Sequence, residues 1–160
     1  EALADLRDRA WTLHCVGSVT RDATTAARVR AEIADHGLAT RVRLHGEVDA
    51  HALQAFYHRA DVFVLPSLHE GYGMALAEAL ARGLPVVSSR AGAIADTVPP
   101  EAGLLVPPGD VLALRRALAR VLDEPALRAG LAAGARAARQ RLPSWAQVVE
   151  HFAGVLRAVA

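Results

Sequence analysis

The chain has 160 residues, of which 52% are hydrophobic and 22% are charged, a composition typical of one globular domain and unlike that of a disordered chain. The formal net charge is +1, so charge alone predicts neither nucleic-acid binding nor attraction to a membrane surface. All 18 basic residues are arginines, which excludes mechanisms that need a lysine of this chain. The single cysteine, Cys15, excludes an internal disulfide and a zinc site built from several cysteines.

The first residues and the lengths of the apolar runs indicate the cellular compartment of the protein. No apolar run is long enough for a membrane span, and residues 1–6 lack the pattern of a signal peptide, so we expect a cytoplasmic protein. Residues 1–10 have the pattern of an amphipathic helix that is entered midway. From this we expect the chain to be a fragment of a longer protein.

Short apolar runs alternate with helical patterns along the first two thirds of the chain. Such alternation is typical of a parallel sheet covered by helices on both faces. The predicted strands are Trp11–Val16, Arg41–His45, Val62–Leu65, Pro85–Ser88 and Gly103–Val106. We therefore expect one α/β domain over residues 1–160, with a Rossmann-like, doubly wound parallel sheet and a helical C-terminal tail.

Capping residues predict where the helices begin and end. Three helices are preceded by an aspartate, whose carboxylate can accept hydrogen bonds from the free amides of the first turn: Asp22, Asp49 and Asp110. Gly37 and Gly83 stand where two helices should end in the left-handed conformation. The last third of the chain is helical throughout. There Pro125 should occupy a first turn, and Ser144 should cap a final helix that ends near Ala160.

The segment after the predicted strand Val62–Leu65 carries the strongest signal of chemistry. In open parallel sheets, ligands bind at the carboxyl ends of the strands. Here Gly71 and Gly73 stand just before a helix and allow close approach of a ligand to the backbone. The amides from Tyr72 to Met74 would then suit an anion such as a phosphate. A tight strand-to-helix connection without a ligand would need the same residues, so both interpretations stay open.

Two carboxylates accompany this turn. Glu70 precedes the helix, and Glu78 lies on it, about 7 Å along the axis from a start near Gly73. A ligand across the start of the helix could meet both side chains, and ionised carboxylates suit the vicinal hydroxyls of sugars. The competing interpretation is that Glu70 only complements the helix dipole, while Glu78 pairs with Arg82, its i+4 neighbour.

The run EGYGMALAEA, residues 70–79, resembles the E-x7-E signature of retaining glycosyltransferases of family 4, which have the GT-B fold. Four further blocks are similar to that family in order and spacing: ADVFVLPS (60–67), GLPVV (83–87), AGAIAD (91–96) and GLLVPPGD (103–110). The resemblance runs from about Trp11 to the end of the chain. It implies the donor-binding, C-terminal half of a GT-B fold, and hexosyl transfer from a nucleotide-diphosphate sugar.

The resemblance also implies a role for each matching residue. Glu70 would hold hydroxyls of the donor hexose, and Glu78 would accept hydrogen bonds from the nucleotide ribose. Gly17 would lie near the diphosphate and Val48 near the nucleobase. The sugar and the diphosphate would contact the amides of Gly71, Tyr72, Gly73 and Met74. Transfer would retain the anomeric configuration without a metal or other cofactor, because oriented donors would stabilise the developing phosphate charge.

Two parts of the family pattern are not found in this chain. One is the opening strand with its Gly-Arg and Lys-Gly residues, and the other is the acceptor-binding N-terminal domain. We therefore expect the fragment to be inactive alone. The strand Trp11–Val16 should leave an unpaired edge, pair directly with Val62–Leu65, or recruit a strand from another copy.

Other functions stay open on the residues alone. One is a sugar-nucleotide epimerase of the same fold, and another is a non-catalytic nucleotide-binding or assembly module. A phosphorylase is excluded because its pyridoxal cofactor needs a lysine. The seven histidines form no ligand pattern, so we expect no metal site. Arg90 is either a phosphate contact or a solvated side chain, and the donor base, the sugar and the acceptor remain open.

Overall fold

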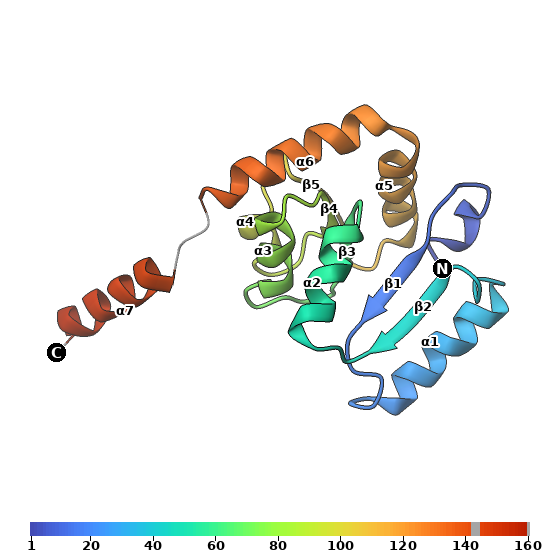
Figure 1. Ribbon diagram of the computed structural model, residues 1–160, viewed down its shortest axis with the longest axis horizontal. Coiled ribbons are helices and arrows are strands. Elements are labelled where there is room, and N and C mark those ends of the chain that lie inside the picture. The colour runs from blue at the N-terminus through green and yellow to red at the C-terminus, as the bar shows by residue number, and fades with distance from the viewer. Residues whose placement is uncertain (142–144, 160) are drawn as a thin grey trace.

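The computed structural model describes residues 1–141 and 145–159, within which each strand is followed by a helix (Figure 1). The strands are β1 (Leu13–Val16), β2 (Val42–Gly46), β3 (Phe63–Leu65), β4 (Val86–Ser89) and β5 (Gly103–Val106). All five predicted strands are present, with their ends within two residues of the predicted ones. The α/β class expected from the sequence is confirmed.

The helices begin and end close to the predicted capping residues. They are η1 (Ala4–Leu6), α1 (Ala23–Asp35), α2 (Ala50–Arg59), α3 (Met74–Ala81), α4 (Ile94–Thr97), α5 (Val111–Asp123), α6 (Pro125–Arg139) and α7 (Trp145–Val159). Three predicted N-caps accept a backbone hydrogen bond, namely Asp22 from Thr25 at 2.9 Å, Asp49 from Ala52 at 2.8 Å and Asp110 from Ala113 at 2.8 Å. The predicted cap at Ser144 lies outside the described residues.

The strands form two separate parallel sheets. β1 pairs with β2, while β3, β4 and β5 pair in that order. In the part of the chain that the structure describes, β1 and β3 are not hydrogen-bonded to each other, so β1 has an unpaired edge. This is the first of the three outcomes predicted for this strand. The doubly wound sheet is thus divided between β1 and β3.

The β3–β4–β5 sheet lies between two hydrophobic clusters. One cluster joins side chains of α2, α3, α4 and α6 to Val86, and the other joins η1, α5 and α6 to Val87. Because successive side chains of a strand point to opposite faces of the sheet, Val86 packs in one cluster and Val87 in the other. All four residues of β4 are buried, which is typical of the central strand of a sheet covered on both faces.

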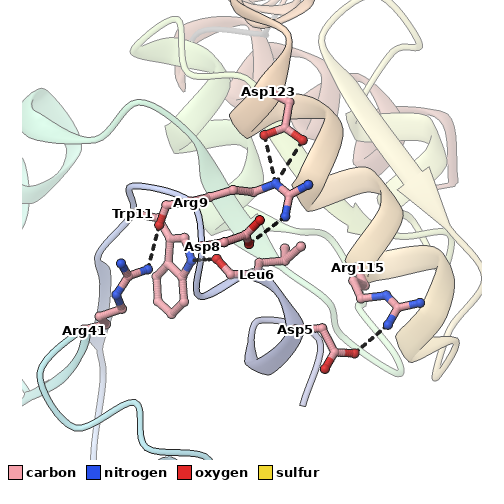
Figure 2. Close-up of polar contacts among 8 residues, drawn as sticks. All are labelled: Asp5, Leu6, Asp8, Arg9, Trp11, Arg41, Arg115 and Asp123. Atoms are coloured by element: carbon pink, nitrogen blue, oxygen red, sulfur yellow. Dashed lines mark hydrogen bonds and ion pairs between the residues drawn. The ribbon is translucent and has the colours of Figure 1, made fainter.

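The segment before β1 is held against α5 by side-chain contacts (Figure 2). Arg9 Nε donates to both carboxylate oxygens of Asp123, at 2.8 and 2.9 Å. The Trp11 indole donates to the Leu6 carbonyl at 2.7 Å. The same carbonyl also accepts the Arg9 amide at 3.2 Å, which is the i+3 bond of a 3-10 turn. The α-helix predicted for residues 1–10 is therefore wrong, and η1 is a single 3-10 turn.

α6 packs closely on the segment before β5 at Gly134. An added Cβ there would lie 1.9 Å from the Glu101 carbonyl oxygen, whereas at Gly130 on the same helix it would meet nothing within 4 Å. We expect Gly134→Ala to lower the free energy of unfolding by about 1–3 kcal/mol, because the helix must move away from this backbone. Gly130→Ala should raise it by about 0.5–1 kcal/mol through the higher helix propensity of alanine. Urea denaturation of both variants measures the difference, and equal effects would contradict the packing.

α7 lies apart from the rest of the domain, at one end of the molecule (Figure 1). Several of its large apolar side chains are exposed, namely Val148, Val149, Phe152, Val155 and Leu156. Among the described residues, no helix is both long enough and apolar enough to cross a membrane. α7 is therefore an amphipathic helix whose apolar side chains stay open to solvent in this structure.

Candidate functional site

The turn between β3 and α3, residues 66–73, is held by hydrogen bonds from the segment that runs from the end of β4 to α4, residues 89–97. Three carbonyls of the turn accept hydrogen bonds from this segment: Ser67 from the Ser89 hydroxyl, Glu70 from the Ala93 amide at 3.0 Å and Tyr72 from the Thr97 hydroxyl at 3.0 Å. The donors come from the end of β4, from the loop after it and from α4. The backbone of the turn is thus held in place from outside the turn at three of its carbonyls.

The carboxylate of Glu70 lies at the amino end of α3. Its Oε1 atom accepts a hydrogen bond from the Gly73 amide at 3.2 Å, and the residue is half-buried. The prediction that the Gly73 amide is free is therefore wrong, because the Glu70 side chain caps it. Gly73 is the N-cap of α3 and has no side chain that could cap the following amides. The first-turn amides of α3 therefore remain donors for a ligand.

The backbone requires glycine at one of the two glycine positions of the turn and not at the other. Gly73 has φ +82°, and an added Cβ would lie 3.0 Å from Leu76 Cδ1, so the fold itself requires glycine there. Gly71 has no positive φ, and an added Cβ would meet nothing within 4 Å. Packing and backbone conformation therefore give no reason for glycine at this position. What the missing side chain provides is open surface beside Glu70, where a ligand can approach the backbone closely.

Glu78 lies on α3 with 43% of its side chain exposed. Its Oε2 atom is 3.7 Å from Arg82 Nη1, so the i+4 pair of the competing interpretation is present. Such a partly exposed pair contributes at most about 1 kcal/mol. A ligand hydroxyl can therefore compete for the carboxylate of Glu78.

Tyr57 is a neighbour of this pair that the sequence analysis missed. The Arg82 guanidinium lies 4.3 Å from the centre of its ring. Burial, and then the charge of Glu78, raise the pKa of the Tyr57 hydroxyl above its usual value. Tyr57 belongs to α2, and no spacing in the sequence connects it with a residue of α3, so only the three-dimensional fold could reveal the contact.

Gly17 and Val48 lie at the carboxyl ends of β1 and β2. The Gly17 amide donates to the Gly46 carbonyl at 2.9 Å, so the segments that follow these two strands lie side by side. Val48 is half-buried between β2 and α2. The structure thus brings Gly17 close to the segment of Val48, and Glu70 close to Gly73. Within residues 1–141 and 145–159 it shows no hydrogen bond between these two pairs.

Three large apolar side chains that lie within four residues of Glu70 in the sequence are exposed. Leu68, Tyr72 and Met74 are exposed by 76, 60 and 67%, respectively. Large apolar side chains gathered at one exposed place are typical of contact with a ligand or a partner. The turn therefore combines a carboxylate, free backbone amides and apolar surface, which together suit a ligand with hydroxyls, a negative charge and a ring.

Solved and curated proteins resemble this chain over most of its length. Sucrose-phosphate synthase from Thermosynechococcus elongatus matches 99% of this chain and 40% of its own, with a TM-score of 0.87 and 33% identity. Glycogen synthase of Mycobacterium tuberculosis is 41% identical over 110 residues, which are 68% of this chain and 26% of that protein. D-inositol 3-phosphate glycosyltransferase of Acidothermus cellulolyticus is 38% identical over 135 residues, 84% of this chain and 30% of that protein.

The fold and these likenesses define a glycosyltransferase domain, the Rossmann-like C-terminal domain of the GT-B type. The family described as glycosyl transferases group 1 matches residues 1–124, and the chain belongs to this family. It spans less than a third of the length of the two curated relatives. The resemblance seen in the sequence is confirmed at this level.

Proposed function

We propose that this domain binds a nucleotide-diphosphate sugar and serves the retaining transfer of its hexosyl group, as in glycosyltransferases of family 4. The observation that carries the proposal is the fixed turn before α3. There a half-buried carboxylate, that of Glu70, lies beside free first-turn amides and beside a glycine that the fold does not require. Because the family is that of group 1 glycosyl transferases, a sugar donor is the ligand that these groups fit best.

In this proposal different residues bind different parts of the donor. Glu70 accepts hydrogen bonds from hexose hydroxyls, and the amides of Gly71 and Tyr72 and of the first turn of α3, which begins at Met74, face the sugar and the diphosphate. Glu78 leaves Arg82 in part to accept the ribose hydroxyls. Gly17 lies near the diphosphate, and Val48 contacts the nucleobase.

Bond cleavage in this proposal depends on fixed dipoles. The leaving diphosphate gains negative charge as the bond to the sugar breaks, and the positive end of α3 stabilises that charge. Because three carbonyls of the turn are already bound, these amides need little reorganisation when the charge develops. No metal or other cofactor takes part. The acceptor is bound by another domain of the whole protein.

Titration calorimetry of the whole protein with UDP, GDP and ADP tests the proposal. We expect one of these nucleotides to bind, and Glu78→Ala to weaken that binding about 10- to 100-fold through lost hydrogen bonds to a charged acceptor. Glu32→Ala is the matched control, since Glu32 is an exposed residue of α1. If no nucleotide bound, or if both variants bound it equally well, the proposed donor site would be wrong.

A further inference from the structure

β5 is the outer strand of its sheet and has backbone groups that point away from β4. The Arg90 amide donates to the Val106 carbonyl at 2.7 Å, so the main-chain groups of Val106 face β4. Since alternate residues of a strand direct their N–H and C=O groups to the same side, those of Gly103 and Leu105 face the opposite side. Among the described strands none pairs with that side. This free edge is distinct from the turn at Glu70.

A hollow of about 480 Å³ runs along this edge. The residues of β5 form its floor. Ala95, Val98 and Pro100 line one side, and α5 lines the other. The exposed residues on the first of these sides, Ala95 and Pro100, are apolar, so this side can take aliphatic side chains.

The charged groups that line the hollow are all arginines: Arg90, Arg116 and Arg120. No acidic residue lines it. Arg120 pairs with Glu124 at 3.1 Å, but both side chains are about half exposed, so this pair is weak. In the described part of the chain, neither Arg90 nor Arg116 lies within ion-pair distance of a carboxylate. The hollow is therefore a positively charged groove with an apolar wall.

The spacing of two arginines matches that of side chains on a strand. Arg116 and Arg120 are four residues apart on α5, about 6 Å along the helix axis. Side chains on one face of an extended strand repeat every two residues, about 6.6 Å. Two acidic residues at alternate positions of an added strand can therefore each reach one arginine, while the residues between them face the apolar wall.

We propose that the β5 edge binds an extended peptide segment in which acidic and apolar residues alternate. The segment adds a strand to the sheet through the outward N–H and C=O groups of β5, above all those of the half-buried Leu105, since Gly103 is buried. Its acidic side chains pair with Arg116 and Arg120, and Arg90 meets a further negative charge at the end of β4.

Two other occupants fit the groove less well. A second copy of this chain paired edge to edge would bring both sets of arginines within about one Debye length, roughly 8 Å, where like charges repel. A nucleic acid would find no aromatic side chain in the lining on which a base could stack. Moreover, the free edge alternates donors and acceptors, which matches a peptide backbone, whereas phosphates only accept.

Fluorescence anisotropy of a labelled peptide tests the proposal on the whole protein. The probe contains Val-Glu-Val-Glu-Val, and its comparison peptides have the same residues in two blocks or have lysine in place of glutamate. We expect the alternating acidic peptide to bind, the block isomer to bind at least about tenfold more weakly, and the lysine peptide not to bind. The double variant Arg116→Ala, Arg120→Ala should weaken binding about tenfold, since two exposed pairs are lost.

Two further variants separate strand addition from simple charge attraction. Leu105→Pro removes an outward donor without breaking the pairing to β4, and it should also weaken binding about tenfold. Arg28→Ala with Arg30→Ala removes the same charge from exposed positions on α1 and should leave binding unchanged. Thermal unfolding shows whether each variant is folded. If the block isomer bound equally well, if the α1 variant lost as much affinity, or if inorganic polyphosphate bound tightly while Leu105→Pro had no effect on the peptide, the proposal would be overturned.

Discussion

Gly92→Ala is expected to lower the free energy of unfolding by about 2–4 kcal/mol and to weaken donor binding. Gly92 has φ +54°, and an added Cβ would lie 2.1 Å from the Glu70 carbonyl oxygen. The next residue, Ala93, donates its amide to that same carbonyl. A side chain at position 92 would therefore push the two segments apart, break this hydrogen bond and displace the carboxylate of Glu70 from the amino end of α3.

Gly71→Ala is the matched control for this prediction. Gly71 lies next to Glu70, but an added Cβ there makes no clash and the residue has no positive φ. The free energy of unfolding of this variant should stay within about 0.5 kcal/mol of that of the unchanged protein. Urea denaturation of both variants gives the comparison. If the Gly92 and Gly71 variants were equally stable, the close packing of Gly92 on the Glu70 carbonyl would be contradicted.

Glu70→Gln is expected to lower kcat of sugar transfer about 10²- to 10³-fold, the loss typical of removing one preorganised electrostatic contact from a transition state. The amide of glutamine keeps an oxygen that can accept from the Gly73 amide, so the turn should keep its conformation. The charge that the carboxylate directs at the donor sugar is lost. Donor affinity should therefore change much less than the rate.

The rate is measured with the whole protein as release of nucleoside diphosphate from the donor, and the affinity by calorimetry. Glu32→Gln, on the exposed face of α1, is the control and should keep the full rate. An unchanged kcat for Glu70→Gln would remove Glu70 from the catalytic groups. A loss of affinity as large as the loss of rate would instead give it a role in binding alone.

Local signals in the sequence predicted those parts of the fold that depend on neighbouring residues. Asp22, Asp49 and Asp110 cap their helices because a cap needs only amides two or three residues away. The pairing of Glu78 with Arg82, the competing interpretation of Glu78, depends on a local spacing too, since Arg82 follows the last residue of α3 four positions after Glu78.

Contacts between distant segments could not be predicted in this way. The sequence predicts no helix over residues 94–97, where the structure has α4, and the Thr97 hydroxyl of this helix holds the turn of Glu70 from 25 residues away. At Ala4–Leu6 a single 3-10 turn stands where a helix is expected, and the Leu6 carbonyl accepts both the Arg9 amide and the Trp11 indole. In the turn of Glu70, hydroxyls and an amide from a distant segment therefore decide the local structure.

Nuclear magnetic resonance of the backbone amides, followed while a nucleotide sugar is added, tests most directly where the donor binds. We expect the largest changes in chemical shift on residues 71–76, with smaller ones near Gly17 and Val48. If the signals of that turn stayed in place while those beside β5 or on α6 moved, the donor would be bound elsewhere and the assignment of Glu70 and Glu78 would be contradicted.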